Sequence, residues 1–411
     1  MKLDLNFIRS QFPAFSEPTL QGWAFFENAG GSYPCIQVIN RLTDFYMKNK
    51  VQVHYPFPAS TLAGNLMDAA YGELAGYLNV DAAEIHLGPS TSQNIYVLAN
   101  AMRPMWNDGD EIIVSCQDHE ANAGAWRRLE KKGIKVIEWH VESSSGLLKI
   151  DTLKSLFSER TKMLAFPHCS NVIGHVNPVK EISQLCHQHG ALSVVDGVGY
   201  APHGFPDIKE LECDIYLFSL YKTYGPHLGL MYVDQKLILK MENQSHYFKE
   251  GITRSMLTPA GPDHAQIAAS TGIIDYFDTV YHHHFKKEVS PAERGAAINK
   301  LFQDHEEELM DQLLAFLKTR NDIEIIGPAE STDRAPIISI VPKNKNIKRV
   351  YAQLIEQKIM LGMGNFYAVR PLIDMDIPTD PGVIRISFLH YTSSQEVDQL
   401  INALALVLSK D

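Results

Sequence analysis

Short apolar runs alternate with amphipathic segments between about residues 65 and 235. The runs have the length of buried strands, and the segments between them repeat apolar residues at helical spacing. The expected strands are residues 111–115, 135–139, 162–166, 192–195, 215–218 and 228–233. The expected helices are residues 95–102, 123–130 and 179–189. This alternation predicts an α/β fold in which helices cover both faces of a mostly parallel sheet.

The pattern changes near residue 291. Residues 291–319 place leucines on one helical face, and Ser290 with Pro291 suits an N-cap followed by a first helical position. Strands are then expected at residues 337–341 and 383–387, and helices at residues 350–357 and 394–408. We therefore expect an N-terminal segment of residues 1–20 packed on a small domain, a large domain of residues 21–290, and a small C-terminal α+β domain of residues 291–411.

One lysine lies in a polar turn between two apolar runs. Lys222 follows the run at residues 215–218 and precedes the run at residues 228–233. A lysine between buried strands is poorly solvated, which lowers its pKa and frees its amine to form an imine. Taken alone, an ordinary lysine in a surface turn is the more common explanation. Asp196, at the end of the run at residues 192–195, changes this balance, because pyridoxal phosphate needs a lysine and a carboxylate that pairs with its ring nitrogen.

Three further polar segments accompany the expected elements. Thr91 and Ser92 stand where a helix begins, as a phosphate site requires, although either could be a simple N-cap. His119 follows the first strand and could stack on a pyridine ring, although a turn histidine is the simpler explanation for any one of 17 histidines. Asn171 could donate to a cofactor oxygen or close a turn. Because ligands bind beyond the carboxyl ends of parallel strands, these groups together favour one shared site.

Composition excludes several classes of partner. The chain has 411 residues, 45% hydrophobic and 21% charged, as in ordinary globular proteins. Its formal charge of −11 argues against nucleic acid, and no apolar run is long enough to cross a membrane. The N-terminus lacks the apolar core of a signal peptide, and the 5 cysteines are scattered without metal-binding spacing. We therefore expect a cytoplasmic protein that binds neither nucleic acid nor membranes.

The chain resembles the class V aminotransferase group of fold-type I pyridoxal phosphate enzymes, and within it the cysteine desulfurase-like branch. The resemblance runs from residues 25–32 (FFENAGGS) through the Asp196 and Lys222 motifs to residues 383–391 (VIRISFLHY). It implies a large domain with a mostly parallel, seven-stranded sheet flanked by helices, and a smaller α+β C-terminal domain. It also implies pyridoxal 5'-phosphate as cofactor, a small amino-acid substrate, and a homodimer with a shared active site.

The resemblance also implies roles for individual residues. Lys222 resembles the lysine that forms the imine with the cofactor, Asp196 the partner of the pyridinium nitrogen, and His119 the ring-stacking histidine that relays protons. The residues implied in cofactor binding are Thr91, Ser92, Asn171, Asp196, Ser219, Tyr221 and Lys222. The residues implied in substrate binding are Arg385, Asn28, Ala29 and Gly30. Arg385 resembles the arginine that grips a substrate α-carboxylate, a task that suits the guanidinium fork.

Three departures limit the functional expectation. No cysteine follows Cys213, and Tyr367 stands in the segment where a desulfurase carries its nucleophilic cysteine, which disfavours persulfide formation. Gly199 replaces a glutamine, and Tyr221 replaces the histidine that usually precedes the lysine. The expected reaction is transamination or a β-elimination or C–S lyase reaction on an amino acid. The alternatives are an amino-acid epimerase, a pyridoxal phosphate-binding protein with little activity, and a nicotinamide-dependent dehydrogenase.

Two other patterns are weak. Histidines at residues 282–284 point in different directions on a helix, so a solvated face is a better explanation than a metal site, and no metal is expected. Gly197 and Gly199 form only part of a dinucleotide-binding fingerprint and lack its third glycine, which disfavours a nicotinamide cofactor.

Overall fold

The computed structural model describes residues 1–409 and contains a seven-stranded central sheet. The strands of this sheet are β2 (Ile85–Gly88), β3 (Glu111–Ser115), β4 (Lys135–Trp139), β5 (Thr161–Pro167), β6 (Leu192–Asp196), β7 (Ile215–Ser219) and β8 (Gly229–Val233). Their order is β2-β8-β7-β6-β5-β3-β4. The pairs from β4 to β7 are parallel, while β8 is antiparallel to both β7 and β2. The predicted α/β class with a mostly parallel sheet is confirmed.

Alternating side chains of each central strand enter separate cores on the two faces of the sheet. In β7, Tyr216 and Phe218 join the larger core, and Ile215 and Leu217 join the opposite one. Successive side chains point to opposite faces of a strand, so a continuous apolar run is what a strand covered on both faces requires. The interpretation of residues 215–218 as a doubly buried strand therefore explains their composition.

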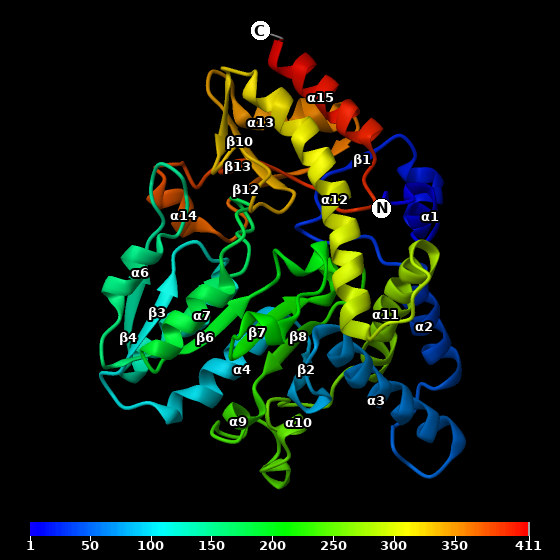
Figure 1. The fold of residues 1–411 in the computed structure, drawn as a ribbon, viewed down its shortest axis with the longest axis vertical. Helices are drawn as coiled ribbons and strands as arrows, with labels where there is room; N and C mark the ends of the chain where they lie inside the picture. Colours follow the sequence, from blue (N-terminus) through cyan, green and yellow to red (C-terminus); the bar gives the residue numbers. More distant parts are fainter. Residues whose placement is uncertain (410–411) are drawn as a thin grey trace.

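Helices cover both faces of this sheet (Figure 1). The helices α4 (Thr91–Met102) and α5 (Glu120–Arg127) pack on the face with the smaller core. On the other face lie α2 (Ile36–Lys48), α3 (Pro58–Leu78), α6 (Ile150–Leu156), α7 (Val179–Gln188) and α11 (His264–His284). Three short helices complete this part: α8 (Ile208–Leu211), α9 (Gln235–Ile238) and α10 (Thr253–Met256).

A second, four-stranded sheet is formed by the C-terminal residues. Its antiparallel strands β9 (Ile323–Ile326), β10 (Ile337–Pro342), β12 (Gly362–Gly364) and β13 (Val383–Ser387) have the order β12-β13-β10-β9. The helices of this region are α12 (Pro291–Lys318), α13 (Ile347–Glu356), α14 (Val369–Asp374) and α15 (Ser394–Ser409). In Figure 1 the long helix α12 runs from the level of the central sheet to the smaller sheet. Ser290 and Glu293 form a capping box at its start, as the sequence indicates.

The N-terminal residues join the two regions. Strand β1 (Ala24–Phe25) pairs in parallel with β11 (Ile359–Met360), and Glu27 then bridges to Ser387 at the end of β13. Helix α1 (Leu5–Ser10) contacts α11 through Asp4 and His283, at 3.0 Å, and the C-terminal region through Arg9 and Glu396, at 2.7 Å. The division at residues 20 and 290 stays a prediction. Within residues 1–409, no helix is both long enough and apolar enough to cross a membrane.

Candidate active site

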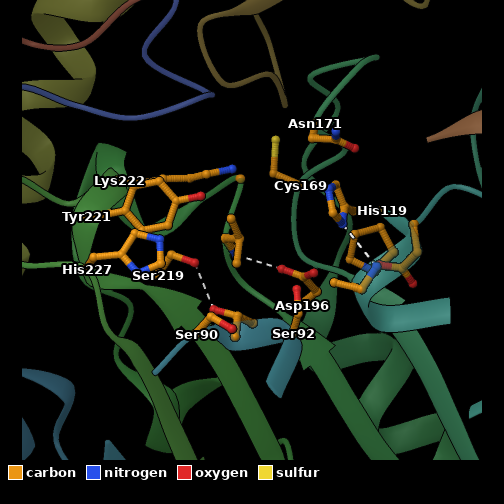
Figure 2. A pocket seen from close by; sticks show the side chains of 16 residues that line it. Ser90, Ser92, His119, Cys169, Asn171, Asp196, Ser219, Tyr221, Lys222 and His227 are labelled. Atoms are coloured by element: carbon orange, nitrogen blue, oxygen red, sulfur yellow. Dashed lines mark hydrogen bonds between the residues drawn. The ribbon is translucent and has the colours of Figure 1, made fainter. Parts of the chain in front are cut away.

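One cavity lies at the edge of the central sheet where its parallel strands end. Strands β3, β5, β6 and β7 are parallel, so the residues that follow them meet at one edge. Because β8 runs in the opposite direction, its beginning lies at this edge too, and so does the end of β2. The enclosed volume is about 230 Å³. Figure 2 shows the side chains that surround it, among them Lys222, Asp196, His119, Asn171, Ser92 and Ser219.

Lys222 is half-buried and its side chain lines this cavity. Among residues 1–409, no hydrogen bond or ion pair engages its Nζ atom, which lies 5.8 Å from the centre of the Tyr221 ring. Burial and, to a smaller extent, the charge of Arg385 lower the pKa of Lys222 to about 8 against the opposing charges of Asp196 and Glu27. At pH 7 an amine with this pKa is uncharged in about a tenth of the molecules, far more than an ordinary lysine, and the uncharged form is a nucleophile and a base.

Asp196 lies at the end of β6 beside a second carboxyl group, Asp118. Burial raises the pKa of Asp196 to about 6, while the Val198 backbone N–H, at 2.8 Å, and the charge of Lys222 lower it. Burial, followed by the charge of Asp196, raises the pKa of Asp118 well above its usual range. The geometry therefore keeps the negative charge on Asp196, which has a donor and a nearby cation, and the proton on Asp118. Two adjacent buried carboxyl groups with one charge are the expected result of their mutual repulsion.

His119 caps helix α5 and is held in one tautomer. Its Nδ1 accepts a hydrogen bond from the Ala121 backbone N–H at 3.0 Å, so the proton of the neutral ring is on Nε2. Burial, followed by the charges of Lys222 and Arg385, lowers the pKa of His119 to about 4. The ring therefore stays neutral and offers a flat face to the cavity. The Tyr367 ring lies at its far side, with a centroid distance of 5.4 Å.

Hydroxyl groups gather at the opposite end of the cavity. Helix α4 begins at Thr91, after the N-cap Ser90, and Ser92 follows. The Thr91 and Ser219 hydroxyl groups are 2.8 Å apart, which joins the start of α4 to the end of β7. His227 stacks on Tyr221 with a centroid distance of 4.6 Å and lines the cavity beside Ser219 (Figure 2). A helix N-terminus with hydroxyl groups and an adjacent histidine is suited to binding an anion.

Arg385 lies behind Asn171 and does not line the cavity itself. It is 3% exposed; its Nη1 donates to the Asn171 carbonyl at 3.1 Å and its Nη2 to Glu27 at 2.7 Å. The Phe366 ring covers the guanidinium at 3.8 Å, and the Asn171 side chain donates to the Phe366 carbonyl at 3.0 Å. The acidic partner of Arg385 is thus Glu27, which lies 358 positions away along the chain. The residues close to Arg385 in the sequence do not indicate this pairing.

The residues 28–30 lie between Lys222 and the end of β13. Asn28 is buried; its side chain donates to the Ser387 carbonyl at 3.1 Å and accepts from the Tyr391 hydroxyl group. Asn28 and Ala29 line a space of about 20 Å³ beside Lys222, and the Gly30 backbone N–H donates to the Glu27 carbonyl at 3.0 Å. Both the oxygen and the nitrogen of the Asn28 side chain are hydrogen-bonded within the fold. Asn28 is therefore suited to hold the backbone of residues 28–30 in place.

None of the cysteines offers a reactive thiol. All 5 are buried, and Cys169 is the one that lines the cavity. Burial raises the pKa of Cys169 to about 12, and its Sγ donates to the Gly174 carbonyl at 3.3 Å. The exposed residue on the facing loop is Tyr367. A thiolate is the nucleophile in sulfur transfer, so a thiol with this pKa is poorly suited to it.

The predicted catalytic and cofactor-binding residues line one cavity, whereas the predicted substrate-binding residues Arg385, Asn28, Ala29 and Gly30 do not, and four neighbouring residues were not predicted. Lys222, Asp196, His119, Asn171, Ser219, Tyr221, Thr91 and Ser92 all line the cavity. The residues that were missed are Asp118, His227, Glu27 and Phe366. Asp118 could have been noticed as a neighbour of His119, and His227 as a polar residue next to a strand end. No local signal connects Glu27 or Phe366 to Arg385.

Comparisons with known proteins agree with this arrangement. Residues 24–253 and 297–400 match the family model described as "Aminotransferase class-V". The chain is 33% identical to an aminotransferase-like protein, FGM3, of Gibberella zeae, over 98% of both chains. It is 28% identical to the cysteine desulfurase-like protein ustD of Aspergillus flavus, over 100% of this chain and 92% of that one. The crystal structure of the Escherichia coli cysteine desulfurase CsdA shares the fold, with a TM-score of 0.83, 23% identity and 99% of each chain covered.

The chain belongs to the class V aminotransferase family. It is therefore an enzyme of a pyridoxal phosphate-dependent family that includes cysteine desulfurase-like proteins, and the predicted resemblance is confirmed.

Proposed function

We propose that this enzyme holds pyridoxal 5'-phosphate on Lys222 and removes the α-proton of an amino acid. The observation that carries the proposal is the half-buried Lys222 amine, with a pKa lowered to about 8 and no bonding partner among residues 1–409, in a cavity that is also lined by Asp196. A lysine with this environment and a carboxylate at the same strand-end edge are the two groups that the cofactor takes from its protein.

The remaining residues fit the parts of the cofactor. The Asp196 carboxylate would hold the ring nitrogen, the neutral His119 ring would stack on the pyridine face, and Asn171 would approach the phenolic oxygen. The phosphate would lie at the start of α4, beside the Thr91, Ser92 and Ser219 hydroxyl groups and the first backbone N–H groups of the helix. The Asn171 Oδ1 and Asp118 Oδ1 atoms are buried without partners in the described residues, as expected of atoms that face a ligand.

The bound cofactor supplies an electron sink for the substrate carbon, and this chain supplies the acid–base groups. The Lys222 amine, once released, is the base at the Cα proton, because its pKa is near neutral and its Nζ faces the cavity. The neutral His119 carries its proton on Nε2 and stabilises the ring without adding charge. Return of the proton to a carbon other than Cα would give transamination, and loss of a β-substituent would give the lyase reaction. Both begin with the same step at Lys222.

A persulfide-forming desulfurase is the less suitable interpretation of this site. The loop facing His119 carries Tyr367 and no cysteine, and the pKa of the Cys169 thiol is raised to about 12. Incubation with L-cysteine and no reductant, followed by mass spectrometry, should show no persulfide on this protein. A stoichiometric persulfide on any of the 5 cysteines, with sustained alanine production, would contradict this part of the proposal.

Proton exchange at Cα tests the main proposal. The holoenzyme in deuterated buffer should replace the α-proton of L-alanine or another L-amino acid with deuterium, as followed by proton NMR. Lys222→Ala should abolish the exchange, and Lys135→Ala, at a lysine outside the cavity, should leave it intact. Exchange with inversion at Cα would identify the epimerase alternative. Absence of exchange with every common amino acid, in protein loaded with cofactor, would favour the binding protein with little activity.

We also propose a homodimer, which the family resemblance implies. The end of α2 and the segment that joins it to α3 expose large apolar side chains that include Tyr46, Met47, Tyr55 and Phe57. Exposed apolar residues in one segment favour an interface with a second copy of the chain. Light scattering at micromolar concentration should give twice the monomer mass, and a monomer with full cofactor occupancy would contradict the proposal.

A further inference from the structure

The guanidinium group of Arg385 is already bound to a carboxylate in this structure. Arg385 is 3% exposed, and its Nη2 donates to the Glu27 Oε1 at 2.7 Å. Its Nη1 donates to the Asn171 carbonyl at 3.1 Å, and the Phe366 ring lies 3.8 Å from the guanidinium carbon. The cavity beside Lys222 is lined by Asn171 and not by Arg385. A substrate carboxylate therefore has no free path to this arginine.

The fold makes room for the Glu27 side chain. A Cβ atom at Gly30 would lie 2.6 Å from Glu27 Oε1, and one at Gly362 would lie 2.6 Å from Glu27 Oε2. Two glycines, from separate parts of the chain, thus leave the space that the carboxylate occupies. The Glu27 side chain is 30% exposed, so its carboxylate can turn toward solvent when it leaves Arg385.

The bonding between the two groups is incomplete. The Arg385 Nε and the Glu27 Oε2 are both buried without a hydrogen-bond partner in the described residues. A bidentate pair, in which both carboxylate oxygens accept from the guanidinium, would satisfy both groups. Glu27 instead accepts a single hydrogen bond from Arg385, through Oε1. A substrate α-carboxylate that binds through two N–H groups of Arg385 must take Nη2 from Glu27 or share it, and shared binding places two negative charges side by side.

The loop over Arg385 has a strained backbone. Phe366 and Tyr367, which are consecutive, have φ angles of 51° and 58° in the left-handed region that side chains other than glycine rarely adopt. The loop is held by the Asn171–Phe366 bond and by the Glu120 N–H, which donates to the Tyr367 carbonyl at 2.7 Å. Two consecutive residues held in an unfavourable backbone region are strained, and such strain is common at sites that clamp a ligand.

We propose that Glu27 occupies the place of the substrate carboxylate on Arg385, and that an amino acid binds by displacing it together with the Phe366 ring. The inference rests on the proposed function, because it takes the substrate to be an amino acid with its carboxylate at Arg385. Glu27 is then a residue that sets substrate affinity: it keeps the buried guanidinium paired between turnovers and discriminates against amines that bring no carboxylate to replace it.

The Glu27→Gln variant distinguishes competition from simple positioning. The introduced amide keeps an oxygen that accepts from Nη2 but loses the charge that competes with the substrate. If Arg385 is free of Glu27 for about a tenth of the time, removal of the competing charge lowers the half-saturating amino-acid concentration about tenfold. If Glu27 only positions Arg385, Glu27→Gln stays within about twofold of the wild type and Glu27→Ala binds more weakly.

The first experiment titrates the holoenzyme by its visible absorbance with L-alanine and with ethylamine. Glu27→Gln should lower the half-saturating L-alanine concentration about tenfold and leave that of ethylamine unchanged. Asp275→Asn, which removes the carboxylate from the Arg41–Asp275 pair outside the cavity, is the matched control and should change neither. An unchanged or higher L-alanine requirement in Glu27→Gln overturns the proposal.

The second experiment does not depend on the substrate. Phenylglyoxal modifies accessible arginines, and mass spectrometry locates the product. Arg385 should react about tenfold faster in Glu27→Ala than in the wild type. Arg334, which is also buried but is bonded to backbone carbonyls, should react at the same rate in both. Equal rates at Arg385 overturn the proposal. If no amino acid changes the absorbance but Glu27→Ala still exposes Arg385, the proposed function fails while the Glu27 contact stands.

Discussion

The two ends of the candidate active site, a hydroxyl end that lines the cavity and a carboxylate end that lies behind Asn171, differ in how they are built. The hydroxyl end consists of Thr91 and Ser92, at the start of helix α4, and Ser219, at the end of β7, and all three line the cavity. The carboxylate end consists of Arg385, Glu27 and Phe366, which come from three distant parts of the chain and are closed on one another. One end is ready to receive an anion, and the other already holds one.

This difference follows from what each end would bind. A phosphate group on a resident cofactor stays in place through every turnover, so a preformed cradle of N–H groups and hydroxyl groups loses nothing by remaining open. A buried guanidinium without an anion is costly between turnovers, and an internal carboxylate removes that cost. We therefore expect variants at the hydroxyl end to change cofactor affinity, and variants at the carboxylate end to change substrate affinity.

The largest effect is expected at Lys222, which lies between the two ends. Borohydride treatment of the holoenzyme should fix the cofactor to Lys222, and Lys222→Ala should abolish this adduct completely, because no other amine lines the cavity among the described residues. Intact mass and peptide mapping measure the outcome, with Lys135→Ala as the control. An adduct on another lysine of the wild type would show that the cavity is wrongly assigned.

The next largest effect is expected from Arg385→Ala. Truncation of one partner of a buried charge pair typically costs about 2–5 kcal/mol, so amino-acid binding should weaken by that amount while cofactor absorbance barely changes. Because Glu27 loses its partner as well, the double variant Arg385→Ala with Glu27→Gln is the proper control. Titration of the absorbance with L-alanine measures the effect. Wild-type affinity in Arg385→Ala would show that Arg385 serves only as the structural partner of Glu27.

The two ends also differ in how well the sequence predicts them. The apolar runs predict β3, β4 and β13 with their observed bounds, and the strand order then brings Asp196, Lys222 and His119 together at one edge. Helix α5 begins at Glu120 and not at residue 123, because the His119 side chain caps it, a contact that hydrophobic spacing does not record. Helix α13 likewise begins at Ile347 because Asn346 caps it.

Contacts between remote segments are what the sequence could not provide. Glu27 reaches Arg385 because β1 pairs with β11 and the chain then bridges to Ser387, and none of these pairings follows from the composition of a two-residue strand. His227 reaches the cavity because β8 runs antiparallel to β7, whereas the apolar run at residues 228–233 would look the same in either direction.

A smaller effect is expected at the hydroxyl end from His227→Asn. His227 stacks on Tyr221 beside Ser219. Its ring N–H would therefore donate to a phosphate group in place of the histidine that Tyr221 replaces. Loss of one hydrogen bond to a charged group costs about 1.5–3 kcal/mol, and the affinity of the apoprotein for pyridoxal 5'-phosphate should fall accordingly. Fluorescence titration measures it. Pyridoxal, which has no phosphate group, is the control and should bind the variant and the wild type equally; equal loss for both ligands would contradict the assignment.

The smallest effect couples the two ends through the pKa of Lys222. Below about pH 8 the Lys222 amine is protonated and unreactive, and its reactivity rises as the pH passes through the lowered pKa. The charge of Arg385 lowers this pKa and that of Asp196 raises it, so Arg385→Ala should move the midpoint to higher pH and Asp196→Asn to lower pH. Reductive methylation of the apoprotein with formaldehyde, with the initial rate at Lys222 followed by mass spectrometry, measures the midpoint. The exposed Lys131 is the internal control. Midpoints that do not move, or that move in the same direction in both variants, would mean that burial alone sets the pKa of Lys222 and that the carboxylate end does not act on it.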